Sequence, residues 1–447
     1  MSLCIIAHYG NITTPLGGFD DGDQADCGWR RPGAACMSEV ILHRTDGASL
    51  PTRAARRTPE PAEVRLTRII TAVLPRGAVP ISELGFTTQL AAMAEASMAA
   101  LAADLACYAA WCADERRQPL PADPETIVRY LAMLEARGAK PATLARRVAS
   151  LASVHHLCGL TEGAQPPTSH AMVRSALKAV RRRRGAAQAQ AAPLRFGAAL
   201  DPHSKGFTLS ALLAACGGDL QGLRDAALLS LGYDAGLRVS ELVGVEEAQI
   251  EPQGDGSALL FIPTSKTDQE GQGAWAWLSP DTMRRVGAWL EASAIRSGPI
   301  FRRVGIDRRR ARAAVPPMAY DAIPGNTRHW QARLRGTPAQ AARTVYTVGT
   351  TALTRQGVNT IYRRLALSAY DQGLVAMPAA EVEAAVRAIS THSLRVGLTQ
   401  DLFAAGEDGV GIAQALRWSS PSTALRYGRK LAAHSNVAAR VLSRVRG

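Results

Sequence analysis

Apolar residues recur at helical spacing from about residue 65 onward in the first half of the chain. One such stripe consists of Leu101, Leu105, Tyr108 and Cys112. Residues three and four positions apart lie on one face of a helix, so this spacing predicts an amphipathic helix. A second helix is expected to begin at Asp123 and Pro124 and to end at Gly138, and a third to end at Gly159. With a fourth helix after it, the pattern predicts a small helical domain.

The second half combines helical segments with one pair of strand-like runs. Helical spacing covers about 208 to 216 and 221 to 235, and it resumes from about 354. Short apolar runs at 259 to 263 and 274 to 278 flank a polar loop that contains glycine, which is typical of a β-hairpin. We therefore expect a mainly α fold, with an N-terminal helical domain followed by an α+β domain that holds a small β-hairpin sheet.

Composition along the chain divides it into four parts. With 447 residues, 47% of them apolar, the chain is long enough for two cores. Residues 1 to 64 are rich in Gly, Pro, Asp and Arg without periodicity, which predicts a poorly ordered extension. The helical domain is expected at 65 to 185, a linker rich in Ala and Gln at 186 to 206, and the second domain at 207 to 447. An irregular, arginine-rich stretch at about 302 to 345 is interpreted as an insertion or long surface loop.

Charge and cysteine content narrow the class of protein. Lys and Arg outnumber Asp and Glu by 52 to 38, for a formal net charge of +14, which favours a polyanionic partner over an inert basic surface. The seven cysteines form no CxxC pair, so neither a zinc site nor a disulfide framework is indicated. A signal-peptide pattern is lacking, and no apolar run is expected to reach the length of a membrane span. We therefore expect a cytoplasmic protein with no metal site.

Six residues, most of them near the C-terminus, carry candidate chemistry. They are Arg238, Lys266, His392, Arg395, Trp418 and Tyr427. Taken singly, each has a plain structural explanation: Arg238 can pair with Glu241, a lone histidine is usually a satisfied structural residue, and aromatic residues near helices are usually core. The case for a site depends on their occurring together.

Together these residues resemble the motifs of the tyrosine recombinases, the phage-integrase family. AGLRVSEL supplies Arg238, SKTDQEG supplies Lys266, HSLR supplies His392 and Arg395, and Trp418 and Tyr427 follow at the family's spacing. The resemblance covers about residues 95 to 447. Most members have histidine where this chain has Trp418, but Cre-like members also have tryptophan. An indole N–H only donates, so Trp418 is expected to hold the phosphate without moving protons.

The chemistry of phosphodiester cleavage gives each residue a role. Arg238 and Arg395 carry planar guanidiniums that suit the charge growing on the non-bridging oxygens. A phenol such as that of Tyr427 attacks only with help, for which His392 is the candidate base. Lys266, on the hairpin, is the candidate general acid for the departing 5′ oxygen.

The resemblance also implies the course of the reaction and its partners. It implies a 3′-phosphotyrosyl intermediate, strand exchange through a Holliday junction, and a homotetramer on paired sites of double-stranded DNA, without cofactor or membrane and close to the nucleoid. It further implies that the two domains, core-binding and catalytic, form a clamp around the duplex. A type IB topoisomerase, which relaxes DNA, and a DNA-binding protein that has lost catalysis are the alternatives.

Candidate DNA contacts are spread over both domains. They are Arg146, Arg147, Lys178, Arg181, Arg355 and Asn359. The first three lie on helices of the first domain, where a solvated helix face is the simpler explanation, and Arg181 begins the run RRRRG. Arg355 and Asn359 lie in TRQGVNTIYRR, which resembles the family helix that enters the major groove. There Arg355 is expected to contact a guanine.

Overall fold

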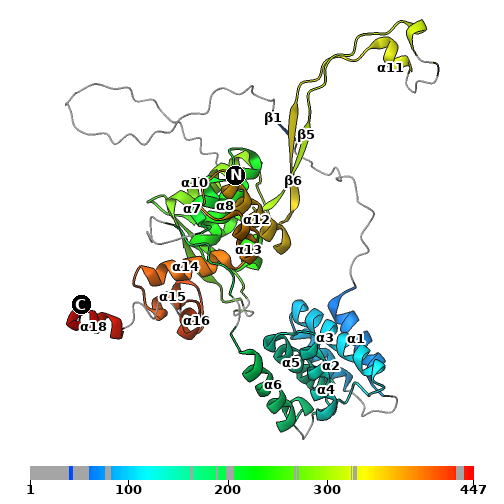
Figure 1. The fold of residues 1–447 in the computed structure, drawn as a ribbon, viewed down its shortest axis with the longest axis vertical. Coiled ribbons are helices and arrows are strands. Elements are labelled where there is room, and N and C mark those ends of the chain that lie inside the picture. The colour runs from blue at the N-terminus through cyan, green and yellow to red at the C-terminus, as the bar shows by residue number, and fades with distance from the viewer. Residues whose placement is uncertain are drawn as a thin grey trace, which may run out of the picture. The chain divides into compact units, whose positions relative to one another are not determined.

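The computed structural model describes residues 40–43, 60–75, 82–161, 165–187, 190–197, 206–265, 268, 271–323, 325, 330–428 and 437–446. Over these ranges the protein is mainly helical, with two three-stranded sheets (Figure 1), which confirms the expected fold class. The chain separates into two compact units. One consists of Met1–Arg44 with Gly305–Thr347, and the other of Thr45–Val304 with Val348–Gly447.

The N-terminal part of the larger unit is a helical bundle. Its helices are α1 (Ala62–Val73), α2 (Glu83–Ala91), α3 (Glu95–Asp114), α4 (Pro124–Ala136), α5 (Pro141–Leu157), the short η1 (Pro167–Ser169) and α6 (Ala171–Arg184). They share one apolar core, in which Leu66, Leu105 and Leu131 are almost completely buried. As expected, Asp123 caps α4, because its carboxylate accepts a hydrogen bond from the Thr126 N–H at 3.0 Å.

Helix α3 corrects one sequence expectation. Its 20 residues are long and apolar enough to cross a membrane, whereas no apolar run was expected to reach that length. Length and composition alone are weak evidence, since core helices pass the same test. Leu101, Leu105, Tyr108 and Cys112, the expected apolar stripe, are all buried in the bundle core. The stripe therefore packs against the protein's own helices.

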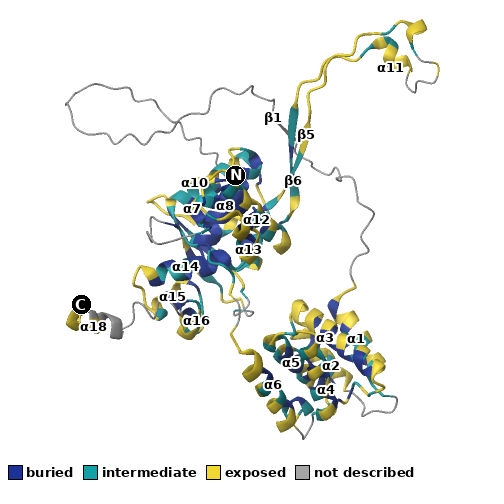
Figure 2. Ribbon diagram, in the orientation of Figure 1, coloured by how far each residue is buried: buried dark blue, intermediate teal, exposed yellow. Residues whose placement is uncertain are grey.

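The second helical region of this unit is built around one buried helix. Its helices are α7 (Leu209–Ala214), α8 (Leu220–Asp234), α9 (Val239–Gly244), η2 (Glu247–Gln249), α10 (Pro280–Ser293), α12 (Arg355–Asp371), α13 (Ala379–Ala388), α14 (Ser393–Ala404), α15 (Gly409–Ala415), α16 (Pro421–Tyr427) and α18 (Val437–Arg446). Helix α8 is buried along most of its length (Figure 2). It packs against α10 and α14, so it connects the turn before α9 with the helix that follows His392.

The expected hairpin is present and forms a sheet with a third strand. Strands β3 (Ala258–Ile262) and β4 (Ala274–Leu278) pair antiparallel, and β2 (Ile250–Pro252) adds to β3. Leu260 lies opposite Ala276, and both are buried, so one face of the sheet packs against the core. With three residues, β2 is too short to produce a recognisable alternation.

The smaller unit holds paired strands in the stretch interpreted as an insertion or long surface loop, so this stretch is not irregular. Strands β5 (Arg302–Arg309) and β6 (Arg343–Ala352) lie side by side, and the bridges Arg312 to Gln340 and Val315 to Thr337 continue the pairing toward η3 (Tyr320–Ala322) and α11 (Trp330–Arg335). We call residues 305 to 347 the arginine ribbon. The sequence pattern did not predict these strands, because runs of arginine and small residues interrupt the apolar alternation that marks a strand.

Strand β1 (Val40–His43) pairs in parallel with β6 and places ordered structure inside the stretch expected to be poorly ordered. The remainder of 1 to 59 lies outside the described residues, as do residues 198 to 205 in the second half of the expected linker.

Candidate active site

Arg238 stands at the N-cap of α9, where a tight turn leads into the helix. Its Nη1 donates to Glu241 Oε1 at 2.8 Å, and its backbone N–H donates to Glu241 Oε2 at 2.9 Å. The turn before it requires glycine, since Gly236 has φ 54° and a Cβ there would come within 2.2 Å of the Leu416 side chain. The ion pair expected as the plain explanation for Arg238 is thus present, and it fixes the guanidinium at the start of the helix.

His392 and Tyr427 meet although 35 residues separate them. The His392 Nε2 atom lies 2.9 Å from the Tyr427 hydroxyl, and their ring centroids are 5.5 Å apart. Burial lowers the pKa of His392, and the positive charges of Arg395 and Arg238 lower it further. A neutral imidazole at this distance can accept the phenol proton, which is the geometry required of a general base.

Arg395 lies in the first turn of α14 and is almost completely buried, with 1% of its surface exposed. Its guanidinium donates to the carbonyl oxygens of Gly236 and Leu416. Burial, together with the charges of Arg238 and Arg417, lowers the pKa of Arg395 to about 9. The group therefore stays charged at neutral pH, at a cost that an incoming phosphate would reduce.

Trp418 lies between Arg395 and Tyr427. Its ring stacks on that of Tyr427, with centroids 5.3 Å apart and planes 13° from parallel. The Arg395 Cζ atom is 5.1 Å from the centroid of the same indole. The contacts of Trp418 therefore hold the tyrosine ring, a role that sequence reasoning did not assign. Its expected hydrogen bond to a phosphate stays a prediction.

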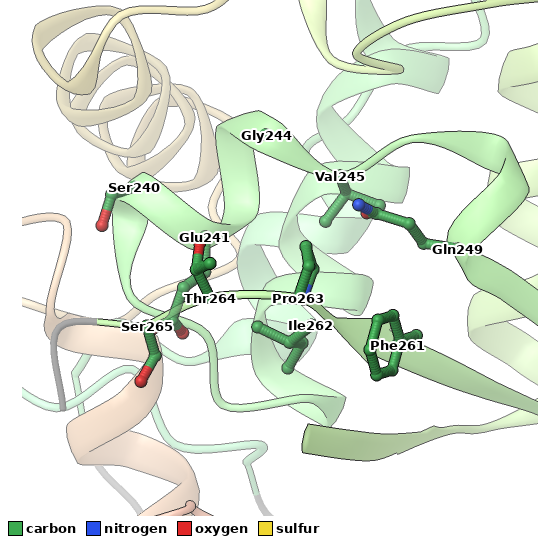
Figure 3. Close-up of a pocket in the computed structure, with 10 residues that line it drawn as sticks. All are labelled: Ser240, Glu241, Gly244, Val245, Gln249, Phe261, Ile262, Pro263, Thr264 and Ser265. Atoms are coloured by element: carbon green, nitrogen blue, oxygen red, sulfur yellow. The ribbon is translucent and has the colours of Figure 1, made fainter. Parts of the chain in front are cut away.

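Lys266, the sixth candidate, lies outside the described residues. The segment that leads to it borders a pocket of about 220 Å³ between α9 and the end of β3. Figure 3 shows Ser240 and Glu241 on the helix side of this pocket, and Thr264 and Ser265 beyond the strand. The described end of β3 thus runs beside the helix that Arg238 caps.

The candidate DNA contacts fall into two groups. Arg146 and Arg147 both form ion pairs with the buried carboxylate of Asp104, and Arg147 has only 17% of its side chain exposed. They therefore join α5 to α3, a structural role that explains Arg147 in particular. Asn359 is also largely enclosed, and its Oδ1 is buried without a hydrogen-bond partner among the described residues.

Lys178, Arg181 and Arg355 form the second group, and all three are exposed. Arg355 is the first residue of α12, whose N-cap Thr354 accepts a hydrogen bond from the Gly357 N–H at 3.0 Å. An exposed arginine on the first turn of a capped helix can reach a ligand. Its expected contact with a base stays a prediction.

Sequence reasoning missed Arg417, which lies beside Arg238 and Glu241 in the candidate active site. Its Nη2 donates to the Ala235 carbonyl at 2.9 Å and lies 3.8 Å from Glu241 Oε2. No sequence pattern marked this arginine, because its position depends on the way the chain folds back on the turn before α9.

Two named recombinases are similar to this chain in sequence. It is 34% identical to the integrase/recombinase xerD homolog of Selenomonas ruminantium over 218 residues, which are 47% of this chain and 60% of that protein. It is 25% identical to the recombinase cre of Escherichia phage P1 over 335 residues, which are 75% of this chain and 84% of that protein. The match thus spans less than two thirds of the first relative. No family model matches the chain.

Two solved structures were compared with the fold of this chain. The XerH site-specific recombinase bound to a palindromic difH substrate has a TM-score of 0.49 at 11% identity, over 87% of this chain and 97% of that chain. The Tn1549 transposon integrase in complex with a circular intermediate DNA has a TM-score of 0.44 at 12% identity, over 86% of this chain and 99% of that chain.

Proposed function

We propose that this chain is a site-specific DNA recombinase that cleaves and rejoins duplex DNA through a covalent 3′-phosphotyrosyl intermediate. The observation that carries the proposal is the 2.9 Å contact between the Tyr427 hydroxyl and His392 Nε2, made beside the guanidiniums of Arg238 and Arg395. A phenol with a neutral base and two nearby cations has the parts needed to attack a phosphodiester. The similarity to two named recombinases supports the same reaction.

Phosphate binding is the first step of the proposed reaction. Arg395 is buried, and two backbone carbonyls fix the orientation of its guanidinium. Its positive charge is therefore preorganised for the non-bridging oxygens. Arg238 is held by Glu241 at the N-terminus of α9, where the helix dipole also favours an anion. Both groups stabilise the transition state more than the substrate, because negative charge grows there during attack.

The attack itself uses Tyr427 and His392. The Tyr427 oxygen forms a bond to phosphorus while its proton passes to His392 Nε2, and the bond from phosphorus to the 5′ oxygen breaks. Trp418 keeps the phenol ring in place through stacking. Lys266 is proposed to give its proton to the departing 5′ oxygen. Attack of a 5′ hydroxyl on the phosphotyrosine reverses these steps and rejoins the strand.

Strand exchange requires more than one copy of the chain. We propose that four copies assemble on two sites and exchange one pair of strands at a time through a Holliday junction. We also propose that Trp418 corresponds to the tryptophan of Cre-like members. The exposed Arg355 at the start of α12 is proposed to contact a base in the major groove.

Covalent capture from a random library tests this proposal and identifies the DNA site in the same experiment. A library of nicked random-sequence duplexes is incubated with the protein, and DNA that stays attached under denaturing conditions is sequenced. We expect captured sequences to share inverted repeats around a short spacer, with none captured by Tyr427→Phe. Plasmids carrying two such sites should then recombine, whereas relaxation without exchange would indicate a topoisomerase. Binding without any covalent product from the wild-type chain would refute the proposed chemistry.

A further inference from the structure

Arg417 occupies a backbone position that normally belongs to glycine. Helix α15 ends in a turn in which the Arg417 N–H donates to the Gln414 carbonyl at 3.1 Å and the Trp418 N–H donates to the Ala413 carbonyl at 2.8 Å. This pair of bonds is the Schellman arrangement, which places the residue after the C-cap in the left-handed region. Arg417 has φ 55° there, a conformation that glycine adopts without steric cost and that other residues resist. The arginine side chain must therefore offer something that a glycine cannot.

The Arg417 side chain is enclosed, with 11% of its surface exposed, and it is only partly satisfied. Its Nη2 donates to the Ala235 carbonyl, but Nε and Nη1 are buried without a partner among the described residues. Buried donors without partners are uncommon because each has lost its hydrogen bonds to water. In native proteins such atoms often have a catalytic role or bind an ordered water or ion.

The contacts of Arg417 parallel those of Arg395. Arg395 connects the Gly236 carbonyl to the Leu416 carbonyl, and Arg417, the residue after Leu416, reaches the carbonyl of Ala235. Two guanidiniums thus join the turn before α9 to the end of α15. This connection ties the segment that carries Trp418 to the turn that carries Arg238.

Glu241 lies between two of these arginines. Its side chain is 4% exposed, and in this structure Oε1 accepts from the Arg238 guanidinium at 2.8 Å. Oε2 accepts from the Arg238 backbone N–H at 2.9 Å and lies 3.8 Å from Arg417 Nη2. A phosphate bound by Arg238 would compete with Glu241 for the same guanidinium. Glu241 would keep the backbone N–H of Arg238 but lose its cation, which is costly for a buried carboxylate, so it needs a second cation within reach.

We propose that Arg417 is a positioning residue that takes over the Glu241 carboxylate when a DNA phosphate engages Arg238. The inference rests on the proposed function and deepens it, since it concerns how the phosphate site is prepared. In the free protein Glu241 holds Arg238 in place. On DNA binding, Arg417 moves closer to the carboxylate, which already lies 3.8 Å from its Nη2, so Arg238 can direct its full charge at the phosphate.

Arg417→Gly is the informative variant, because glycine fits φ 55° better than arginine does. If Arg417 only shaped the turn, this variant would fold and cleave at least as well as the wild type. We expect its melting temperature to be retained, while single-turnover cleavage of a pre-bound nicked substrate slows by roughly 10²-fold, the loss associated with a small misplacement of reacting groups. Arg417→Lys keeps the charge without the planar fork and should recover part of the rate. Wild-type cleavage by Arg417→Gly would overturn the proposal.

A double-mutant cycle with Glu241→Gln tests the route of the effect. If Arg417 acts through Glu241, Arg417→Gly should add little to the defect of Glu241→Gln. Full additivity would mean that Arg417 acts independently and would also overturn the proposal.

A measurement without cleavage separates this inference from the proposed function. Orthovanadate, a phosphate mimic, should raise the melting temperature of the wild-type protein by binding at Arg238 and Arg395. The rise should be smaller for Arg417→Gly, in which Arg238 is less readily released from Glu241. Equal rises in the two proteins would exclude the proposed transfer even if the wild type forms no covalent adduct with DNA.

Discussion

Arginine is used in opposite ways in the candidate active site and in the arginine ribbon. Arg395 and Arg417 are enclosed and bound to backbone carbonyls, so each guanidinium has one geometry. Among the described residues of the ribbon, the exposed arginines are Arg308, Arg309, Arg310, Arg312, Arg333 and Arg335. Arg309 pairs with Asp307 at the surface, where such a pair contributes little. Buried charges are costly to maintain but strong and directional, whereas exposed charges are screened and mobile.

This difference predicts a division of labour between rate and affinity. An enclosed guanidinium can stabilise charge that appears only in the transition state, so its loss should slow chemistry. The exposed arginines of the ribbon offer diffuse attraction to a polyanion, so their loss should weaken salt-sensitive binding. Four predictions test this division, and they are given from the largest expected effect to the smallest.

The greatest change should come from the groups that act on the reacting phosphate. Lys266→Ala should slow cleavage by roughly 10²–10⁴-fold, the contribution typical of general acid catalysis. A substrate whose bridging 5′ oxygen is replaced by sulfur should restore most of that loss, because a thiolate leaves without a proton. Arg395→Ala should show no such recovery, since it acts on the non-bridging oxygens. Single-turnover cleavage of both substrates provides the measurement, and equal defects of Lys266→Ala on the two would exclude it as the acid.

The second prediction concerns the ribbon. Replacing Arg309, Arg310 and Arg312 by Gln should flatten the dependence of log affinity on log salt by about 0.9 for each arginine that contacts a phosphate. The cleavage rate of DNA already bound should not change. Binding is measured between low and moderate salt, with Arg129→Gln on α4, an exposed arginine paired with Glu125, as the matched control. A slower chemical step in the ribbon variant would break the proposed division.

The third prediction separates two roles of Trp418. Its stacking on Tyr427 predicts that Trp418→Phe keeps most activity, whereas Trp418→Ala loses up to about tenfold, the value of an aromatic pair. The hydrogen bond to phosphate expected from sequence predicts instead that Trp418→His is active and Trp418→Phe is not. Cleavage rates of the three variants decide between the roles, and wild-type activity of Trp418→Ala would remove Trp418 from the site.

The smallest change is a shift in the titration of His392. Burial, Arg395 and Arg238 hold the pKa of His392 below its usual value of 6.5 in the free protein. The stability linked to this group is therefore present above pH 6.5 and is lost as pH falls below that value toward the lowered pKa. Histidine NMR of the free protein should show the lowered pKa, and Arg395→Gln should move it upward. An unchanged pKa in Arg395→Gln would mean that Arg395 does not act on the base.

Local patterns allowed much of the fold and of the site to be predicted, while long-range contacts did not follow from them. The stripe from Leu101 to Cys112 specified α3 because helical spacing depends only on neighbouring residues. The pairing of Arg147 with Asp104 depends on how α5 packs on α3, so the sequence suggested a DNA contact instead. Arg417 was not predicted for the same reason, since its role depends on a left-handed backbone and on a contact with Ala235, which is distant in the sequence.

The contact between His392 and Tyr427 is made within a single chain. Under the proposed function, each subunit would therefore cut the strand that it holds itself, in cis. In such an assembly, the order of cutting would not depend on one subunit supplying its tyrosine to the site of a neighbouring subunit. Its timing would have to come from displacing Tyr427 from its own histidine, and α16, which ends at that tyrosine, is the element that a neighbouring subunit would have to move.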